Sequence, residues 1–404
     1  MNSDILLEVK NLCQYFKSGT SELKAVDDVS FSVRKGEVFG LVGESGCGKT
    51  TTGRSIIRLY NITSGNIYFK GTRIAAGTRA LEEEYKRVKK ERDKLSASKA
   101  ENAEEALKEA DAALAKLREE IASAKSDDKH CNRQYAEEEM RRVRERYEPL
   151  LASCAETERE KLEKEYKEAL RIASKDRITN KIQMIFQDPI ASLNPRMTVR
   201  DIIAEGLIIK GIRDKKYIDE QVYRMLDLVG LSPEHSGRYP HEFSGGQRQR
   251  IGIARAIIMQ PELIIADEPI SALDVSIQAQ IINLINDLRR ELDLTVLFIA
   301  HDLSVVKYFS DRIAVMYYGK IVELADSDEL FRHPLHPYTR SLLSAIPLPD
   351  PVYEKKRKRI SYNPLLAHDY STDKPRLQEV CEGHFVLCNE AEFAEHLKTV
   401  KEKA

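Results

Sequence analysis

The chain has 404 residues, of which 42% are hydrophobic, and its formal net charge is −1. This length allows two or three structural units with a full-sized hydrophobic core. The near-zero charge excludes a protein that binds nucleic acid through an overall basic field. No apolar run approaches the roughly 18–20 residues that span a bilayer, and residues 1–8 show no signal-peptide pattern. We therefore expect a cytosolic protein whose membrane association is peripheral.

The six cysteines form neither a double CxxC pattern nor a dense disulfide framework. They are Cys13, Cys47, Cys131, Cys154, Cys381 and Cys388. Such scattered cysteines are typical of free thiols in a reducing compartment.

Residues 38–42 (VFGLV) predict a buried strand, and residues 43–50 (GESGCGKT) follow at once. This stretch matches the P-loop pattern GxxxxGK[ST], with a strand before it and a helix predicted at 51–59 after it. Glycines allow consecutive N–H groups to face phosphate oxygens, and the helix N-terminus adds a favourable partial charge. Lys49 is expected to reach the β- and γ-phosphates, and the Thr50 hydroxyl to hold Mg²⁺. The predicted nucleotide contacts here are Gly43, Ser45, Gly46, Cys47, Gly48, Lys49, Thr50 and Thr51.

From residue 78 to residue 177 the chain is rich in Glu, Lys, Arg and Ala, with no Gly and one Pro, Pro149. Apolar residues recur at alternating spacings of three and four, which predicts one narrow seam on each of two long helices. The seams are Ala103, Ala106, Ala110, Ala113, Leu117, Ile121 and Ala124, and then Ala136, Met140, Val143, Tyr147, Leu150 and Cys154. A polar break at 126–132 between them predicts an antiparallel coiled-coil hairpin with arms of about 45 residues. Because the seam is Ala-rich, a disordered charged linker is the alternative.

A second predicted strand, 263–267 (LIIAD), ends in a carboxylate that is followed by Glu268. In this position Asp267 is expected to organise Mg²⁺ through a bound water. Glu268 is expected to act as the general base that polarises the attacking water. An Asp-Glu pair after a strand is often only a solvated turn, but the upstream P-loop favours the functional interpretation.

Four further motifs resemble those of ABC ATPases. Residues 243–247 (FSGGQ) resemble the ABC signature LSGGQ, with Phe in place of Leu, and they precede an Arg-rich helix predicted at 248–259. Their exposed N–H groups predict a second phosphate cradle. Gln187 resembles the Q-loop glutamine, His301 after the predicted strand 295–300 resembles the switch histidine, and residues 271–274 (SALD) resemble the D-loop. The resemblance implies that Ser244, Gly245, Gly246, Gln247 and Asp274 contact nucleotide, and that Gln187 senses Mg²⁺.

The resemblance narrows to the ATPase subunits of oligopeptide/dipeptide (peptide/nickel) importers. It rests on residues 186–199 (FQDPIASLNPRMTV), 273–280 (LDVSIQAQ), 333–340 (HPLHPYTR) and 377–388 (LQEVCEGHFVLC). Two departures stand out: the helical block is not part of the usual pattern, and a Cys-rich stretch between Pro364 and Pro375 is missing. Cys381 and Cys388 alone are too few for an iron–sulfur cluster.

The family implies an α/β P-loop fold with a RecA-like core, an antiparallel β-subdomain and a helical signature subdomain. The expected domains are 1–77 with 178–330 for ATP binding, 78–177 for the helical insert, and 331–404 for the C-terminal extension. The implied partners are a second ATPase subunit, two membrane permease subunits and, indirectly, an external solute-binding protein, at the cytoplasmic face of the membrane. No nucleic-acid partner is expected.

Within this family scheme Glu268, His301 and Gln187 are the expected catalytic residues, with ATP and Mg²⁺ bound. Phe16, expected after a first strand at 6–12, is the candidate for stacking on adenine; Tyr15 is the alternative, and both also fit a core role. One rival is a non-transport ABC ATPase with a coiled coil, although there the coil interrupts the segment between Q-loop and signature, which is short and intact here at 191–242. The other rival is a scaffold whose helical hairpin recruits a partner protein.

Overall fold

The computed structural model describes residues 4–19, 21–97, 103–154, 156–346, 359–371 and 373–403. Its contacts divide the chain into two units: Met1–Ser32 with Arg54–Lys181 and Glu205–Ile218, and Val33–Gly53 with Ile182–Ala204 and Asp219–Ala404. Along the chain, three helices pass from one unit to the other: α1 (Lys49–Ile56), α5 (Val199–Ile209) and α6 (Lys215–Leu228).

The first unit contains a four-stranded sheet in the order β2-β1-β4-β5. Its strands are β1 (Ile5–Ser18), β2 (Ser21–Arg34), β4 (Ser64–Phe69) and β5 (Thr72–Thr78). β4 pairs antiparallel with both β1 and β5. Leu7 faces Phe69 and Val9 faces Ile67 across β1 and β4, and all four side chains are buried. This is the expected antiparallel β-subdomain, with alternate residues of each strand facing the core.

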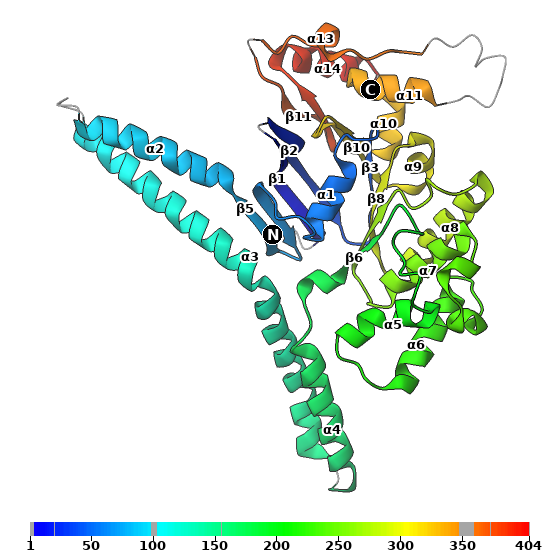
Figure 1. Ribbon diagram of the computed structural model, residues 1–404. Helices are drawn as coiled ribbons and strands as arrows, with labels where there is room; N and C mark the ends of the chain where they lie inside the picture. Colours follow the sequence, from blue (N-terminus) through cyan, green and yellow to red (C-terminus); the bar gives the residue numbers. More distant parts are fainter. Residues whose placement is uncertain are drawn as a thin grey trace, which may run out of the picture. The chain divides into compact units, whose positions relative to one another are not determined.

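Three helices follow β5, and their antiparallel packing confirms that the insert is helical. They are α2 (Arg79–Ala97), α3 (Ala103–Ser153) and α4 (Glu156–Ala173). The N-terminal half of α3 lies beside α2 and its C-terminal half beside α4 (Figure 1). Side-chain pairs fix this direction: Arg92 bonds Asp111 at 3.1 Å, and Tyr147 stacks on Tyr166.

The turn predicted at 126–132 is wrong, because α3 continues through it as one 51-residue helix. The polar residues there contact β-subdomain side chains instead of forming a turn. Arg73 of β5 donates to Asp127 Oδ2 at 2.6 Å, and Arg58 donates to Asp128 Oδ1 at 3.0 Å. Cys131, in the middle of α3, is 1% exposed. The insert is thus docked on the β-subdomain by the centre of α3.

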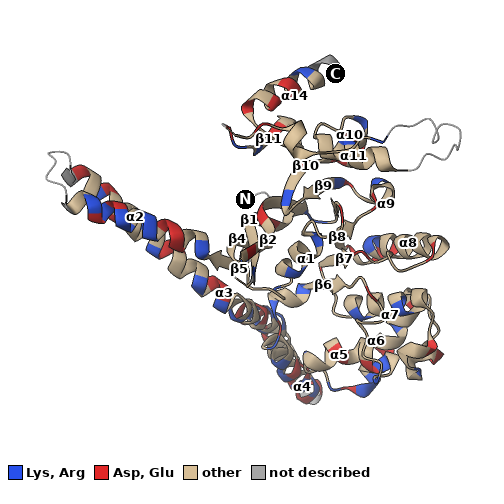
Figure 2. Cartoon of the chain, turned by 45° about the horizontal axis from the view of Figure 1, so that its top comes forward, with Lys and Arg blue, Asp and Glu red and all other residues tan. Residues whose placement is uncertain are grey.

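The predicted seams agree with the structure only in part. Pro149 lies inside α3, which continues to Ser153, so it does not break the helix. Leu150 is exposed, whereas Leu117, Ala124 and Ala136 are buried as expected. Lys and Arg alternate with Asp and Glu along α2, α3 and α4 (Figure 2), as on solvated helices stabilised by local ion pairs.

The second unit is built on an eight-stranded sheet in the order β11-β12-β10-β9-β3-β8-β7-β6. Five strands are parallel: β3 (Val38–Val42), β6 (Ile182–Ile185), β7 (Leu263–Asp267), β8 (Thr295–Ala300) and β9 (Arg312–Tyr317). Every residue of β3, β7 and β8 is buried. Such continuous apolar strands are typical of a parallel sheet covered on both faces, and they confirm the predicted α/β core.

Antiparallel strands continue this sheet into the C-terminal extension. They are β10 (Lys320–Asp326), β12 (His384–Cys388) and β11 (Arg376–Cys381). Among the described residues of this unit, the remaining helices of eight or more residues are α7 (Gly245–Ile257), α8 (Val275–Leu292), α11 (Pro337–Ala345) and α14 (Glu390–Lys403). The shorter ones are α9 (Leu303–Phe309), α10 (Ser327–Arg332) and α13 (Pro364–Ala367).

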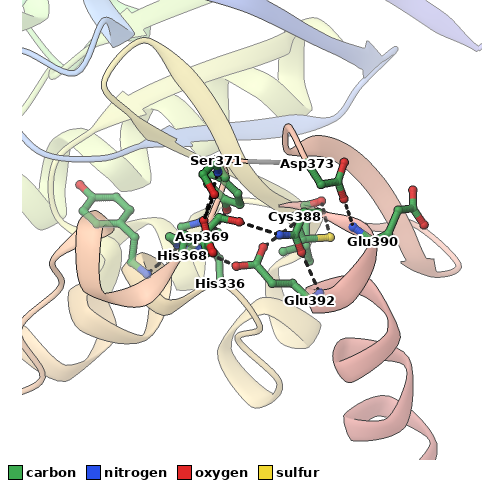
Figure 3. Close-up of polar contacts among 12 residues, drawn as sticks. His336, His368, Asp369, Ser371, Asp373, Cys388, Glu390 and Glu392 are labelled. Carbon is green, nitrogen blue, oxygen red and sulfur yellow. Dashed lines mark hydrogen bonds and ion pairs between the residues drawn. The ribbon is translucent and has the colours of Figure 1, made fainter.

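Polar contacts hold the extension together (Figure 3). His368 Nδ1 lies 2.6 Å from Glu392 Oε1, and the Asn389 amide donates to the Asp369 carbonyl at 3.1 Å. His336 accepts the Tyr338 N–H through Nδ1. Burial lowers the pKa of His336 to about 3, so the imidazole is neutral at physiological pH and keeps the lone pair that accepts this bond. The basic run at 355–359 lies outside the described residues except for Arg359.

None of the helices in the described ranges is both long enough and apolar enough to cross a membrane.

Candidate ATP-hydrolysis site

Four neighbouring strands of the parallel sheet end at the predicted site residues. In the order β3-β8-β7-β6, β3 leads into the P-loop, β8 into His301, β7 ends at Asp267, and Gln187 follows β6. The carboxyl ends of parallel strands lie at one edge of a sheet, where α/β proteins bind ligands. Segments far apart in sequence are thereby brought together (Figure 1).

The P-loop backbone requires glycine at its first position. Gly43 has φ +153°, and a Cβ there would lie 2.1 Å from the Met316 carbonyl oxygen. Lys49 Nζ donates hydrogen bonds to the carbonyl groups of Gly43 and Glu44, at the start of the loop, at 2.8 and 2.9 Å. These contacts hold the ammonium group inside the loop, next to where phosphates bind in P-loop proteins. Cys47, within the loop, is buried, and burial raises the pKa of its thiol.

Thr50 and Asp267, both expected to organise Mg²⁺, lie together. The Thr50 hydroxyl donates to Asp267 Oδ1 at 2.8 Å, and the Asp267 side chain is buried at the end of β7. A hydroxyl beside a carboxylate provides the hard oxygen ligands that Mg²⁺ prefers. The residues present therefore fit a Mg²⁺ site.

Glu268 is the centre of the polar contacts at this edge. Gln187 Nε2 donates to Glu268 Oε2 at 3.1 Å, and His301 Nδ1 lies 3.1 Å from the same oxygen. Lys49 Nζ is 3.9 Å from Glu268 Oε1. The carboxylate is thus surrounded by three polar groups from three other segments of the chain.

The backbone at Glu268 is also unusual, with φ +43°. This left-handed conformation is uncommon for a residue with a side chain and is often found at functional sites. The Glu268 N–H donates to the Ile299 carbonyl of β8 at 2.9 Å, which fixes the turn after β7. The side chain is nearly buried, while the His301 side chain is 52% exposed. The arrangement holds Glu268 rigidly and leaves His301 accessible from solvent.

The signature residues form the N-terminus of α7. The Ser244 hydroxyl accepts the Gln247 N–H at 3.4 Å, and Gln247 Oε1 accepts the Ser244 N–H at 3.0 Å. This reciprocal pair is a capping box. A Cβ at Gly246 would lie 2.6 Å from Ile277 Cγ2, so glycine permits close packing there. Asp274 begins α8 as its N-cap.

Sequence reasoning missed a link between the P-loop and the C-terminal extension. The Glu44 N–H donates to the Tyr338 hydroxyl at 3.2 Å, and Tyr338 is 2% exposed. Tyr338 lies in the 333–340 motif (HPLHPYTR), which we used only as a family marker. No local pattern indicated this contact, because it joins residues 294 positions apart.

Phe16 lies within β1 rather than after the first strand, because β1 extends to Ser18. Its ring packs edge-on against Tyr60 at 5.3 Å. The Tyr15 hydroxyl donates to Asp27, and Lys24 lies over the Tyr15 ring. Both residues belong to the first unit, whereas the P-loop belongs to the second.

A P-loop that leads into a helix, a carboxylate pair after a buried strand, and a glycine-rich helix N-terminus define a P-loop ATPase of the ABC type. A family model described as ABC transporter matches residues 26–144 and 150–271. The chain belongs to the ABC transporter family, as an ATPase subunit. A second model, described as the C-terminal region of oligopeptide/dipeptide transporters, matches residues 322–381.

Several curated proteins are similar over nearly the whole chain. The oligopeptide transport ATP-binding protein OppF of Bacillus subtilis is 48% identical over 389 residues, covering 96% of this chain and 97% of that protein. The dipeptide transport ATP-binding protein DppF of Lactococcus lactis is 41% identical over 391 residues, covering 96% and 95%. Matches of this extent must include most of residues 78–177. The expectation that the helical insert departs from the family pattern is therefore wrong for these relatives.

Solved structures share the fold at low sequence identity. The cbiO1 protein of Clostridium perfringens is similar with a TM-score of 0.51 and 19% identity, covering 82% of this chain and 92% of that one. The ATP-binding cassette MJ0796, in a dimeric structure with ADP and Pi, is similar with a TM-score of 0.50 and 21% identity, covering 80% and 99%. These likenesses confirm the ABC ATPase fold.

Proposed function

We propose that this chain drives an oligopeptide or dipeptide importer by hydrolysing Mg·ATP at the cytoplasmic face of the cell membrane. It works with a second ATPase subunit and two permease subunits, and an external solute-binding protein delivers the solute. The support is the C-terminal match at 322–381 and the relatives named for oligopeptide and dipeptide transport.

The observation that carries the ATP-hydrolysis part of this proposal is the set of contacts around Glu268. A carboxylate nearly buried beside Lys49, Gln187 and His301 is positioned to take a proton from water that attacks the γ-phosphate. Gln187 and His301 hold this carboxylate in place. Lys49 neutralises charge on the β- and γ-phosphates. Thr50 and Asp267 would hold Mg²⁺, which would supply further positive charge to offset that of the phosphates.

The signature residues serve the nucleotide of the partner subunit. Ser244 caps the 13-residue helix α7, which begins with Gly245 and Gly246, and N–H groups at such an end attract phosphate. Binding of ATP between two subunits favours a closed dimer, and loss of the γ-phosphate releases it. Asp274, the N-cap of α8, completes this interface.

Peptide uptake in the native organism tests the proposal. A strain whose chromosomal copy carries Lys49→Ala should lose uptake of a labelled tetrapeptide, because the substitution removes ATP binding at the P-loop. Lys35→Ala is the matched control, since Lys35 is an exposed lysine paired with Asp293 on the surface. Unchanged tetrapeptide uptake with Lys49→Ala would contradict the peptide-import function.

A further inference from the structure

A cysteine, a histidine and a glutamate meet where the C-terminal hairpin joins helix α10. Cys381 ends β11, His384 begins β12, and the two residues are cross-strand partners. Glu329 comes from α10. One donor atom from each of the three lies within 4.8 Å of the other two.

The hairpin turn gives the first two residues a spacing suited to metal binding. Only Glu382 and Gly383 separate Cys381 from His384, and Gly383 has φ +74°, which a tight turn requires. Zinc sites commonly take two ligands separated by two residues. A sequence search for paired CxxC motifs misses this pair because one of its members is histidine.

The orientation of the His384 side chain supports a metal site independently of the spacing between Cys381 and His384. The side chain is completely buried, and its Nε2 lies 2.8 Å from Glu323 Oε1. Its Nδ1 has no hydrogen-bond partner among the described residues and lies 3.5 Å from Glu329 Oε1. A metal-bound histidine usually donates its other ring N–H to a carboxylate. Glu323 occupies the position of that carboxylate, and Nδ1 is directed at Glu329.

This arrangement is unfavourable for a neutral histidine without a cation. If Nε2–H donates to Glu323, then Nδ1 presents a lone pair to the carboxylate oxygen of Glu329. A cation between the two atoms removes the repulsion, and the Cys381 thiol, the third member of the cluster, offers a further ligand to a metal ion.

We propose that Cys381, His384 and Glu329 form a zinc site that fastens the β11–β12 hairpin to helix α10. Thiolate, imidazole and carboxylate together suit Zn²⁺, whereas Mg²⁺ and Ca²⁺ prefer all-oxygen sites. His333 Nδ1 lies 3.1 Å from both carboxylate oxygens of Glu329 and orients that ligand. Water completes the coordination.

The other cysteine of the hairpin is not part of this site. Cys388 donates to the Val386 carbonyl at 3.6 Å and lies beside Glu392 in a separate set of contacts (Figure 3). Burial raises the pKa of the Cys388 thiol to about 12, which keeps it protonated. Cys388→Ser is therefore a matched control for Cys381→Ser.

Metal analysis of the full-length protein tests the site. Protein stripped with a chelator and dialysed against micromolar Zn²⁺ should retain one zinc per chain by elemental analysis. Cys381→Ser should weaken binding by roughly 100-fold or more, since a ligand is lost, and Cys388→Ser should bind like the parent. With Co²⁺ in place of zinc, the parent and Cys388→Ser should show a thiolate-to-cobalt charge-transfer band that Cys381→Ser lacks.

A second variant distinguishes loss of zinc binding from loss of folding. Glu329 is only partly buried, so Glu329→Gln should fold, which circular dichroism checks, and should also bind zinc less tightly. Zinc should raise the melting temperature of the parent but not that of Cys381→Ser. The proposal is overturned if the parent binds no stoichiometric zinc, if Cys381→Ser binds it equally well, or if the purified protein instead carries iron and sulfide.

Discussion

The helical insert and the C-terminal extension both add to the ATPase fold, but they are stabilised in opposite ways. The insert forms three charged helices whose ion pairs are mostly exposed, such as Arg92 with Asp111. The extension adds β12 and β11 to the central sheet through β10 and buries the hydrogen-bonded pair of Glu323 and His384. One addition depends on local helix contacts, the other on long-range strand pairing.

This difference shows where the loss of a polar partner lowers the free energy of unfolding most. Exposed ion pairs contribute little because water competes with them. A buried carboxylate must have all its partners, since an uncompensated buried charge costs several kcal/mol. Glu323 accepts hydrogen bonds from the Leu335 and His336 N–H groups at 2.7 and 3.0 Å and pairs with His384. The extension is therefore part of the ATPase core, and the insert resembles an appendage.

The largest effect on stability should come from Glu323→Ala. It leaves His384 and two backbone N–H groups buried without their partner, which should cost about 3–5 kcal/mol. Denaturant unfolding in the presence of a chelator measures this cost without a contribution from zinc. Glu395→Ala, at an exposed position of α14 in the same extension, is the control. A change below about 1 kcal/mol would show that the extension is no more coupled to the core than the insert.

A moderate effect is expected at the point where the insert docks. Arg73 makes two bonds to Asp127 Oδ2 at 2.9 and 2.6 Å in a partly exposed setting. Arg73→Ala should cost about 1 kcal/mol after allowance for solvent screening. Limited proteolysis should show faster cleavage within residues 78–177. A double-mutant cycle with Asp127→Ala isolates the pair, and a coupling energy near zero would contradict docking through this contact.

The smallest effect is expected on the distal helices. Arg92→Ala removes a contact to Asp111 between side chains that are 40% and 56% exposed, so the free energy of unfolding should change by less than about 0.5 kcal/mol. Melting curves of the variant and parent give the comparison. A loss comparable to that at Arg73 would mean that α2 and α3 do not behave as a solvated pair.

Sequence patterns predicted the parts of the fold that are specified locally. The strands at 38–42, 263–267 and 295–300 have the predicted bounds, because apolar runs next to glycine or a carboxylate are distinctive. The break predicted at 126–132 failed because tertiary contacts override local propensity. Asp127 and Asp128 pair with Arg73 and Arg58 from within a continuous helix, and they do not end it.

Tertiary contacts also explain which features of the two sites the sequence did not predict. Motifs predicted the residues around Glu268, and the structure adds their mutual contacts. The link from Tyr338 to the P-loop and the cluster of Glu329 with His384 join distant segments. Neither has a sequence pattern of its own, since in each case tertiary packing brings a helix, α11 or α10, against a segment far away in sequence.

The most direct test of the account is ATP turnover by Glu268→Gln. The substitution keeps the shape of the side chain but removes its basicity, so turnover should fall by roughly 100-fold or more while ATP binding persists. Glu291→Gln, on the exposed end of α8, should hydrolyse ATP at the parent rate. Glu268→Gln should also accumulate as a closed dimer with ATP. Turnover within a few-fold of the parent would contradict the assignment of Glu268 as the general base, and with it the central claim about this site.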